Sequence, residues 1–159
     1  MPNNESRFST RLCGLINLPD KISERHRQSR LRRAQEASTI ISSQDFVTQV
    51  ILYGSNAYGK PHWISDIDLA VVVFTGSDKI KLRDRQTMCD VYGIELEDIL
   101  VNHNIPVHMS LMAVALVIVT PEMLQEKSNP FFQNILRGRT LFARNPETAV
   151  ITEMDRTIK

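Results

Sequence analysis

Two aspartates and a glycine–serine pair are the residues whose types and spacing point most directly to chemistry. Asp66 and Asp68 open one apolar stretch, and Gly54-Ser55 ends an earlier one, with ten residues between Ser55 and Asp66. Side chains alternate across a strand, so the two carboxylates share a face, about 6.5 Å apart along the chain. Two acids on one face of a buried strand are costly unless a cation neutralises them. Mg²⁺ suits this pair, because it usually binds one or two carboxylates plus substrate phosphates.

The glycine–serine turn supplies the second half of the pattern. Backbone N–H groups and a hydroxyl at such a turn can hold a phosphate. Together, Gly54-Ser55 and the acids at 66 and 68 predict phosphoryl or nucleotidyl transfer. That reaction needs positioning and charge neutralisation more than covalent help from the protein.

Two apolar stretches must carry these residues into position. Residues 47–53 are expected to form a buried strand that ends at the turn, which a short helix over 55–59 follows until Pro61. Residues 66–74 are expected to form a second strand. The continuous apolar run after its acids is typical of a strand that is covered on both faces.

Helices are expected before and after this pair of strands. Apolar residues fall on one stripe over residues 21–43, and Asp20 is a plausible N-cap. A second helix is expected to begin at Gly76-Ser77-Asp78, to break at Gly93 and to continue to about Asn102. Its expected inner residues are Ile80, Leu82, Met88, Val91 and Tyr92 before Gly93, with Leu96, Ile99 and Leu100 in the second piece.

The last third of the chain adds the remaining elements. Residues 105–119 are strongly β-prone and predict two strands, or one strand plus a bend. Thr120-Pro121 predicts a helix start, and residues 130–136 predict a final helix closed by Gly138. Residues 145–159 predict a polar tail or a short terminal helix. Phe131, Phe132, Ile135 and Leu136 are the residues of the final helix that are expected to be buried.

Composition indicates one soluble globular domain of the α/β class, a small mixed β-sheet flanked by helices. The chain has 159 residues, 42% hydrophobic and 23% charged, with a net charge of +1. We divide it into a basic helical extension (1–44), a core (45–145) and a C-terminal tail (146–159). The extension is basic because eight Lys and Arg face three acids in residues 1–33. These eight are Arg7, Arg11, Lys21, Arg25, Arg27, Arg30, Arg32 and Arg33.

A cytoplasmic location without membrane contact is expected from the same inventory. Cys13 and Cys89 lie far apart in no metal-binding spacing, which indicates free thiols in a reducing compartment. The N-terminus has no long apolar segment of the secretory type. The longest apolar run, residues 111–119, is too short to span a bilayer. Nothing in the sequence indicates an oligomeric state.

At this point the motifs resemble those of a known family. Residues 53–59 (Tyr-Gly-Ser-Asn-Ala-Tyr-Gly) and 65–71 (Ser-Asp-Ile-Asp-Leu-Ala-Val) resemble the first loop and the acidic strand of the nucleotidyltransferase superfamily of the DNA polymerase β type. Residues 130–142 resemble its closing helix and strand. The resemblance covers roughly residues 45–143. Within the superfamily, the chain most resembles the minimal nucleotidyltransferases, which include small antitoxin-like members.

The resemblance implies a function for each motif. Asp66 and Asp68 would bind Mg²⁺, which in turn holds a nucleoside triphosphate, and Gly54 and Ser55 would contact its β- and γ-phosphates. The reaction would move a nucleoside monophosphate, with ATP as the expected donor, to an acceptor hydroxyl. Ser65 is a further candidate for nucleotide binding, although a hydroxyl beside a turn more often caps nearby backbone.

One departure from the family pattern concerns a third carboxylate. Family members usually place it on the strand after the middle helix, where it helps to hold a second metal ion and to activate the acceptor. This chain has no acid between Asp98 and Glu122. One alignment puts His108 at the position, and another puts Ala115 there. Neither residue is a good Mg²⁺ ligand, so the acid is absent or another group serves. The fallback candidates are Glu95, Glu97 and Asp98.

The acceptor and the partner stay open at this level. A partner protein is the leading acceptor, as in antitoxin-like relatives that adenylylate a toxin. An aminoglycoside-type small molecule or an RNA end is the alternative, and a nucleotide- or partner-binding module without turnover is the rival class. The basic N-terminal segment predicts either RNA contact or a solvated helix face. His62 and Trp63 could line the nucleotide pocket, or Trp63 could pack on the edge of the core.

Overall fold

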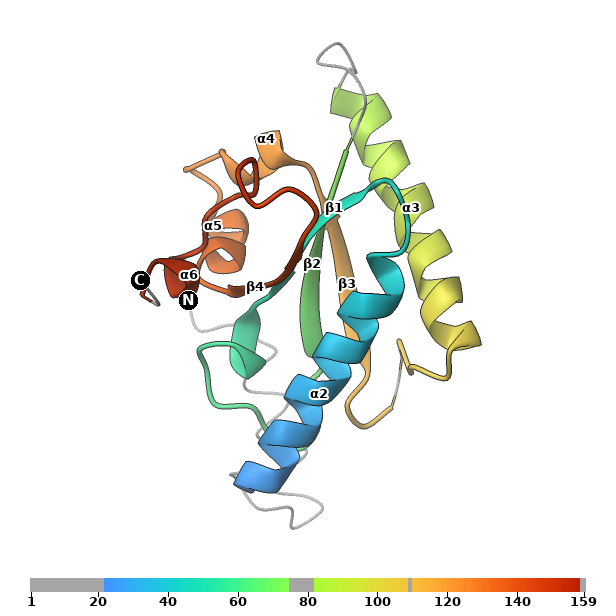
Figure 1. The fold of residues 1–159 in the computed structure, drawn as a ribbon, viewed down its shortest axis with the longest axis vertical. Helices are drawn as coiled ribbons and strands as arrows, with labels where there is room; N and C mark the ends of the chain where they lie inside the picture. Colours follow the sequence, from blue (N-terminus) through green and yellow to red (C-terminus); the bar gives the residue numbers. More distant parts are fainter. Residues whose placement is uncertain (1–21, 75–81, 109, 158–159) are drawn as a thin grey trace.

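Four strands form one mixed sheet in the computed structural model, which describes residues 22–74, 82–108 and 110–157. The strands are β1 (Val47–Leu52), β2 (Ile67–Val73), β3 (Val114–Val119) and β4 (Arg139–Ala143), in the order β3-β2-β1-β4 (Figure 1). β1 runs antiparallel to β2 and β4, whereas β2 and β3 are parallel. The predicted fold class, a small mixed sheet with flanking helices, is therefore confirmed.

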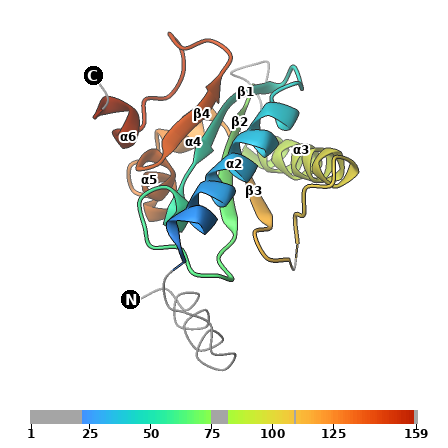
Figure 2. The same cartoon turned by 60° about the horizontal axis from the view of Figure 1, so that its bottom comes forward.

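Helices cover both faces of the sheet, as Figures 1 and 2 show from two sides. The long helices α2 (Glu24–Ile41) and α3 (Leu82–Asn102) pack on one face. The short helices α4 (Pro121–Leu124) and α5 (Pro130–Leu136) pack on the other. This explains the continuous apolar run of β2, because Leu69 and Val71 face the long helices while Ala70 and Val72 face the short ones.

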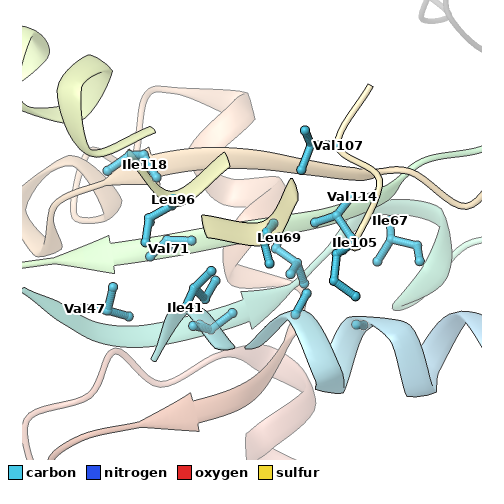
Figure 3. Close-up of a cluster of buried hydrophobic side chains, with 14 of the residues drawn as sticks. Ile41, Val47, Ile67, Leu69, Val71, Leu96, Ile105, Val107, Val114 and Ile118 are labelled. Carbon is cyan, nitrogen blue, oxygen red and sulfur yellow. The ribbon is translucent and has the colours of Figure 1, made fainter. Parts of the chain in front are cut away.

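The larger core lies between the sheet and the two long helices. Ile41 of α2, Leu69 of β2, Leu96 of α3 and Val114 of β3 all point into it, and none is measurably exposed (Figure 3). Burying one such side chain stabilises the fold by about 1.5–3 kcal/mol. Because every strand from β1 to β3 contributes to it, this core fixes the register that places the acids.

Two expectations about the helices need correction. The first helix begins at Glu24, and its N-cap is Ser23, whose hydroxyl accepts a hydrogen bond from the His26 backbone N–H (3.4 Å). The N-cap expected at Asp20 lies outside the described residues, as does the start expected at Gly76. The second helix is continuous through Gly93, because a lone glycine weakens a helix without ending it.

The face assigned to the second helix was partly wrong. Val91 was expected to be buried, but it is 56% exposed, and Cys89, Leu96 and Leu100 form the inner stripe together with the half-buried Tyr92. Within 105–119, the residues that the structure describes form the single strand β3 after a loop, in agreement with the alternative of one strand plus a bend. In that loop Ile105 and Val107 are buried side chains that fill the core without strand structure.

The C-terminal helix starts were predicted more accurately. Thr120 caps α4, accepting a hydrogen bond from the Met123 N–H (3.4 Å), and α5 has the predicted bounds. Phe132 and Ile135 of α5 are buried as expected, whereas Phe131 is 44% exposed. No helix within the described ranges is long and apolar enough to cross a membrane.

The C-terminal segment is hydrogen-bonded to the sheet through one buried glutamine. The side chain of Gln49 in β1 donates to Thr140 Oγ1 (2.9 Å) and to the Val150 carbonyl (2.8 Å), and it accepts from the Val150 N–H (2.9 Å). Asp155 in α6 (Glu153–Arg156) accepts hydrogen bonds from the Thr140 N–H (3.2 Å) and hydroxyl (2.6 Å). The tail therefore contributes polar contacts to the edge strand β4.

We expect Asp155→Asn to lower the free energy of unfolding in a pH-dependent way. Burial alone raises the pKa of Asp155, but hydrogen bonds with Thr140 and Thr152 outweigh it and leave the pKa below its ordinary value. The carboxylate therefore stabilises the fold fully above its unfolded pKa of about 3.9. This stabilisation is lost as the pH falls through the lower folded pKa. At pH 7 we expect a loss of about 1 kcal/mol.

Urea unfolding at pH 7 and at pH values below 4 measures this effect. The difference between wild type and Asp155→Asn should shrink on acidification. Glu147→Gln, at an exposed position, is the control and should change stability by about 0.5 kcal/mol or less. A difference that stays constant with pH would show that Asp155 acts by shape and not by charge.

Candidate active site

The glycine–serine pair forms a tight turn where β1 ends. The Tyr53 N–H donates to the Asp68 carbonyl (3.1 Å), which continues the β1–β2 pairing by one bond. A single 3₁₀ turn, η1 (Gly54–Asn56), follows, and the Gly54 carbonyl accepts from the Ala57 and Tyr58 N–H groups (3.1 and 3.2 Å). The turn therefore lies directly beside the start of β2, where the two acids are.

Gly54 is required by two independent features of this turn. Its φ is +70°, in the left-handed region that favours glycine. A β-carbon placed on it would lie only 2.5 Å from Asp68 Oδ2. The Asp68 carboxylate therefore packs directly on the glycine backbone, at the position that any other side chain would occupy.

The peptide group that follows Asp66 is hydrogen-bonded through both its carbonyl and its N–H. The Asn56 side-chain amide, from the turn, donates to the Asp66 carbonyl (2.6 Å), and the Ile67 N–H donates to the Ala113 carbonyl (2.8 Å). Asp68 lies on the side of Ala70 and Val72, opposite Ile67 and Leu69 in the larger core. Asp66 directly precedes β2 and is exposed, and its position on the side of Asp68 stays a prediction from strand alternation.

The segment before Asp66 is attached to α2 by a buried arginine that sequence analysis did not single out. Arg30 is 2% exposed and donates to the main-chain carbonyls of His62 (3.0 Å), Trp63 (2.8 Å) and Ser65. Burial lowers the pKa of Arg30 below its ordinary value, while the charge of Asp66 acts in the opposite direction. The sequence does carry a signal for its burial, since residue 30 lies on the same helical stripe as the buried Ala34 and Ile41.

Two other candidates in this segment make contacts of the ordinary kind. Ser65 Oγ accepts a hydrogen bond from the His62 N–H (2.9 Å), which is the turn-capping role weighed above; nucleotide binding by Ser65 stays a prediction. The Trp63 ring meets the His26 ring edge-on, with centroids 4.1 Å apart. Trp63 thus packs against α2, which favours the edge-of-core alternative over base stacking.

The strand register distinguishes the two alignments for the third acid. Ala115 of β3 is the direct partner of Asp68 in the parallel β2–β3 pair. The same alternation that separates the two cores puts Ala115 on the side of Val117 and Val119, which is also the side of Asp68. A carboxylate at position 115 would therefore lie next to Asp68 on the neighbouring strand, and this chain has a methyl group there.

The other candidates for the third acid lie elsewhere. His108 is exposed, and its Nε2 is 3.2 Å from Glu97 Oε2. Glu95, Glu97 and Asp98 all belong to α3, which packs on the opposite face of the sheet from Asp68. We therefore drop these three acids as substitutes for the missing carboxylate.

An aromatic residue links the turn to α5. The Tyr58 hydroxyl donates to the Asn134 carbonyl (3.1 Å), and the Arg137 guanidinium lies 4.4 Å from the centre of the Tyr58 ring. Burial raises the pKa of Tyr58, and Asp68 adds to this, whereas hydrogen bonding with the Gly54 backbone and the charge of Arg137 lower it. The exposed Arg137 is thus a cation in the surroundings of the turn and Asp68.

The donor set fits a divalent cation that shares its coordination with a substrate. Among the described residues, no group of three or more His, Cys, Asp or Glu is arranged to hold a metal ion by itself. Two carboxylates suffice for Mg²⁺ when phosphate oxygens and water complete its octahedral shell. The absence of a side chain at Gly54 lets the Asp68 carboxylate lie directly against the turn, so a cation held by Asp68 would be next to the turn's backbone.

Comparison with known proteins agrees with this arrangement. The family described as Polymerase beta, Nucleotidyltransferase matches residues 35–147. The match spans all four strands, and with them the turn and both aspartates. It confirms the superfamily expected from the motifs. No curated protein matches the chain.

Two solved toxin–antitoxin structures are similar to this chain. A mutant of the MntA–HpeT pair has 16% identity and a TM-score of 0.41, covering 79% of this chain and 85% of that one. A toxin–antitoxin structure with AMP-PNP has 20% identity and a TM-score of 0.38, covering 72% and 76%.

Gly54→Ala should be destabilising, and part of the loss should depend on Asp68. A β-carbon on a residue with positive φ lowers the free energy of unfolding by roughly 1–2 kcal/mol, and the clash with the Asp68 carboxylate adds to this loss. Gly93→Ala is the matched control, because its β-carbon would only touch Ile118 Cγ1 at 3.5 Å within a helix. That change should stabilise the fold by about 0.5–1 kcal/mol.

A double-mutant cycle in urea separates the two terms at Gly54. Removing the carboxylate with Asp68→Ala should relieve the contact, so the double variant should be more stable than the sum of the single losses implies. Strict additivity would mean that the backbone conformation alone requires glycine.

Proposed function

This chain belongs to the polymerase β nucleotidyltransferase family, and we propose from that premise that its turn and acids bind a nucleoside triphosphate with Mg²⁺ and transfer its nucleoside monophosphate. One observation carries the proposal. The Asp68 carboxylate packs on the positive-φ Gly54, so the acid and the phosphate-binding turn form one continuous surface. ATP is the proposed donor.

Each residue has a separate role in this proposal. The Ser55 hydroxyl and the N–H groups of the turn bind the β- and γ-phosphates, as backbone nests do. Asp66 and Asp68 hold the cation, which when bound neutralises phosphate charge and orients the leaving group. Arg137, held over Tyr58, adds positive charge near the same phosphates.

The transfer itself requires little covalent help from the protein. The oxygen of an acceptor hydroxyl attacks the α-phosphorus and its proton passes to solvent, the bond from that phosphorus to its bridging oxygen breaks, and pyrophosphate leaves with the electron pair. What the chain must supply is an in-line geometry and a fixed set of charges. Asp68 on β2 and the turn after β1 are rigidly related by strand pairing, which meets that requirement.

Ala115 favours a second candidate function, nucleotide binding with slow or no turnover. A methyl group at this position neither binds a cation nor takes the proton of an acceptor hydroxyl. The triphosphate-binding half of the site is complete with two acids, whereas the half that activates the acceptor lacks its carboxylate. We therefore expect this chain to bind a nucleoside triphosphate but to transfer its nucleoside monophosphate slowly or not at all.

For the acceptor we propose a hydroxyl of a partner protein, a toxin as in antitoxin-like members of the family. The described residues form one sheet with its helices, without a second domain that would enclose a small substrate. A partner would supply the acceptor group and the rest of the pocket. An aminoglycoside or an RNA end remains the alternative to be assayed.

We expect Asp68→Asn to abolish divalent-dependent ATP binding. The amide keeps the shape but loses the charge that attracts the cation, so affinity should fall by more than tenfold. Isothermal titration calorimetry with ATP, in the presence of Mg²⁺ or EDTA, measures this. Asp84→Asn, at an exposed position on α3, is the control and should bind as wild type. Equal binding by wild type in EDTA would contradict a metal-dependent site.

We further expect Ala115→Asp to raise nucleotidyl transfer by tenfold or more. Adjacent strands are about 4.8 Å apart, so the new carboxylate would lie beside Asp68 and could hold a second cation. Transfer from α-labelled ATP to a co-purified partner, or to RNA or an aminoglycoside, is the assay. Ala115→Asn, which is isosteric and neutral, is the control. No gain with Ala115→Asp, despite ATP binding, would support a pure binding function.

A further inference from the structure

Arg30 connects the N-terminal helix to the residue immediately before the first acid. It lies on α2, 35 residues before Ser65 in sequence, and it is 2% exposed. One guanidinium bonds three carbonyls of the segment 62–65 at the same time. Only arginine has enough rigidly arranged donors to do this from one side chain.

The arrangement determines where Asp66 can lie. The peptide group between Ser65 and Asp66 presents its carbonyl to Arg30. The next peptide group, between Asp66 and Ile67, is bonded on both of its edges, by Asn56 and by the Ala113 carbonyl. The α-carbon of Asp66 therefore joins two hydrogen-bonded peptide groups, which restrains its backbone angles and with them the direction of its Cα–Cβ bond.

We propose that Arg30 is a positioning residue, which sets the direction of the Asp66 carboxylate for binding the cation of a metal–nucleotide complex. This inference rests on the proposed function of the site. Arg30 faces the backbone of the segment and not the substrate, so its action passes through Asp66.

The charge and the geometry of Arg30 have opposite effects on cation binding. A positive charge near Asp66 repels an incoming cation, so an arginine that acted only through its field would weaken metal binding. An arginine that orients the carboxylate would strengthen it. The direction in which metal affinity changes on substitution therefore distinguishes the two roles. Lysine provides a second test, because it keeps the charge but not the planar set of donors.

The experiment measures the affinity of the folded full chain for Mn²⁺ with ATP by calorimetry at 10 °C. Arg30→Met should bind at least tenfold more weakly than wild type, and Arg30→Lys at least fivefold more weakly. Ile41→Ala is the control, because Ile41 lies on the same buried stripe of α2 and its loss destabilises the fold without touching residues 62–65. The control should bind within twofold of wild type.

Each result decides the question. Unchanged or tighter binding by Arg30→Lys, which retains the charge and is the variant better able to fold, would overturn the positioning role. Equal weakening in Ile41→Ala would also overturn it, since general destabilisation would then explain the loss. If wild type itself binds no Mn²⁺–ATP, the proposed function fails; if wild type binds and Arg30→Lys binds equally, only the inference about Arg30 fails.

Discussion

The contact between the Asp68 carboxylate and the backbone of Gly54 is the constraint on which the candidate site depends. An acid can lie against the turn only because residue 54 has no β-carbon and accepts a φ of +70°. β1 and β2 are paired up to Leu52 and Leu69, and the bond from the Tyr53 N–H to the Asp68 carbonyl extends the pairing to the turn. The phosphate-binding candidate and the metal-binding candidate are thus held together by the sheet itself.

The two faces of the sheet divide the work of stability and chemistry. The face under α2 and α3 is a continuous apolar core. On the other face, burial decreases along β2 from Val72 and Ala70, which lie under α4 and α5, to the half-buried Asp68. The short helices therefore cover one end of that face and leave the end with Asp68 and Ala115 accessible, which is what a site for a charged substrate needs.

Sequence reasoning reached the sheet, the turn and the acids because these depend on local patterns. Continuous apolar runs predicted β1 and β2 to within one residue at each end, and Thr120-Pro121 marked a helix start. It misjudged Val91, because the apolar stripe of α3 reaches Leu96 through Cys89 and Tyr92 and leaves Val91 exposed. It left the third-acid position open, since only the parallel pairing of Asp68 with Ala115 decides between the alignments. Such a register is a tertiary property.

Arg30 shows why charge alone is a poor guide to function in a basic segment. The cluster in residues 1–33 suggested RNA contact, yet Arg30 is turned inward, where it donates hydrogen bonds to three main-chain carbonyls of residues 62–65. Arg27 is 3.9 Å from Glu24, an exposed pair that contributes little. Arg25 and Arg32 are exposed and remain compatible with phosphate contact. The stripe on which a charged residue falls is therefore more informative than the number of charges near it.

The alanine at position 115 also bears on the electrostatics of the site without its cation. Two neighbouring carboxylates repel each other, and the buried charge of Arg30 near Asp66 offsets part of that repulsion. A third carboxylate beside Asp68 would add repulsion for which the described part of the site offers no further buried cation. Under the proposed function, Ala115 stands where a carboxylate would accelerate transfer, and for the same physical reason it leaves the cation-free site with less repulsion. A protein that spends much of its time waiting for a nucleotide or a partner would gain from that arrangement, whereas a rapid enzyme would not.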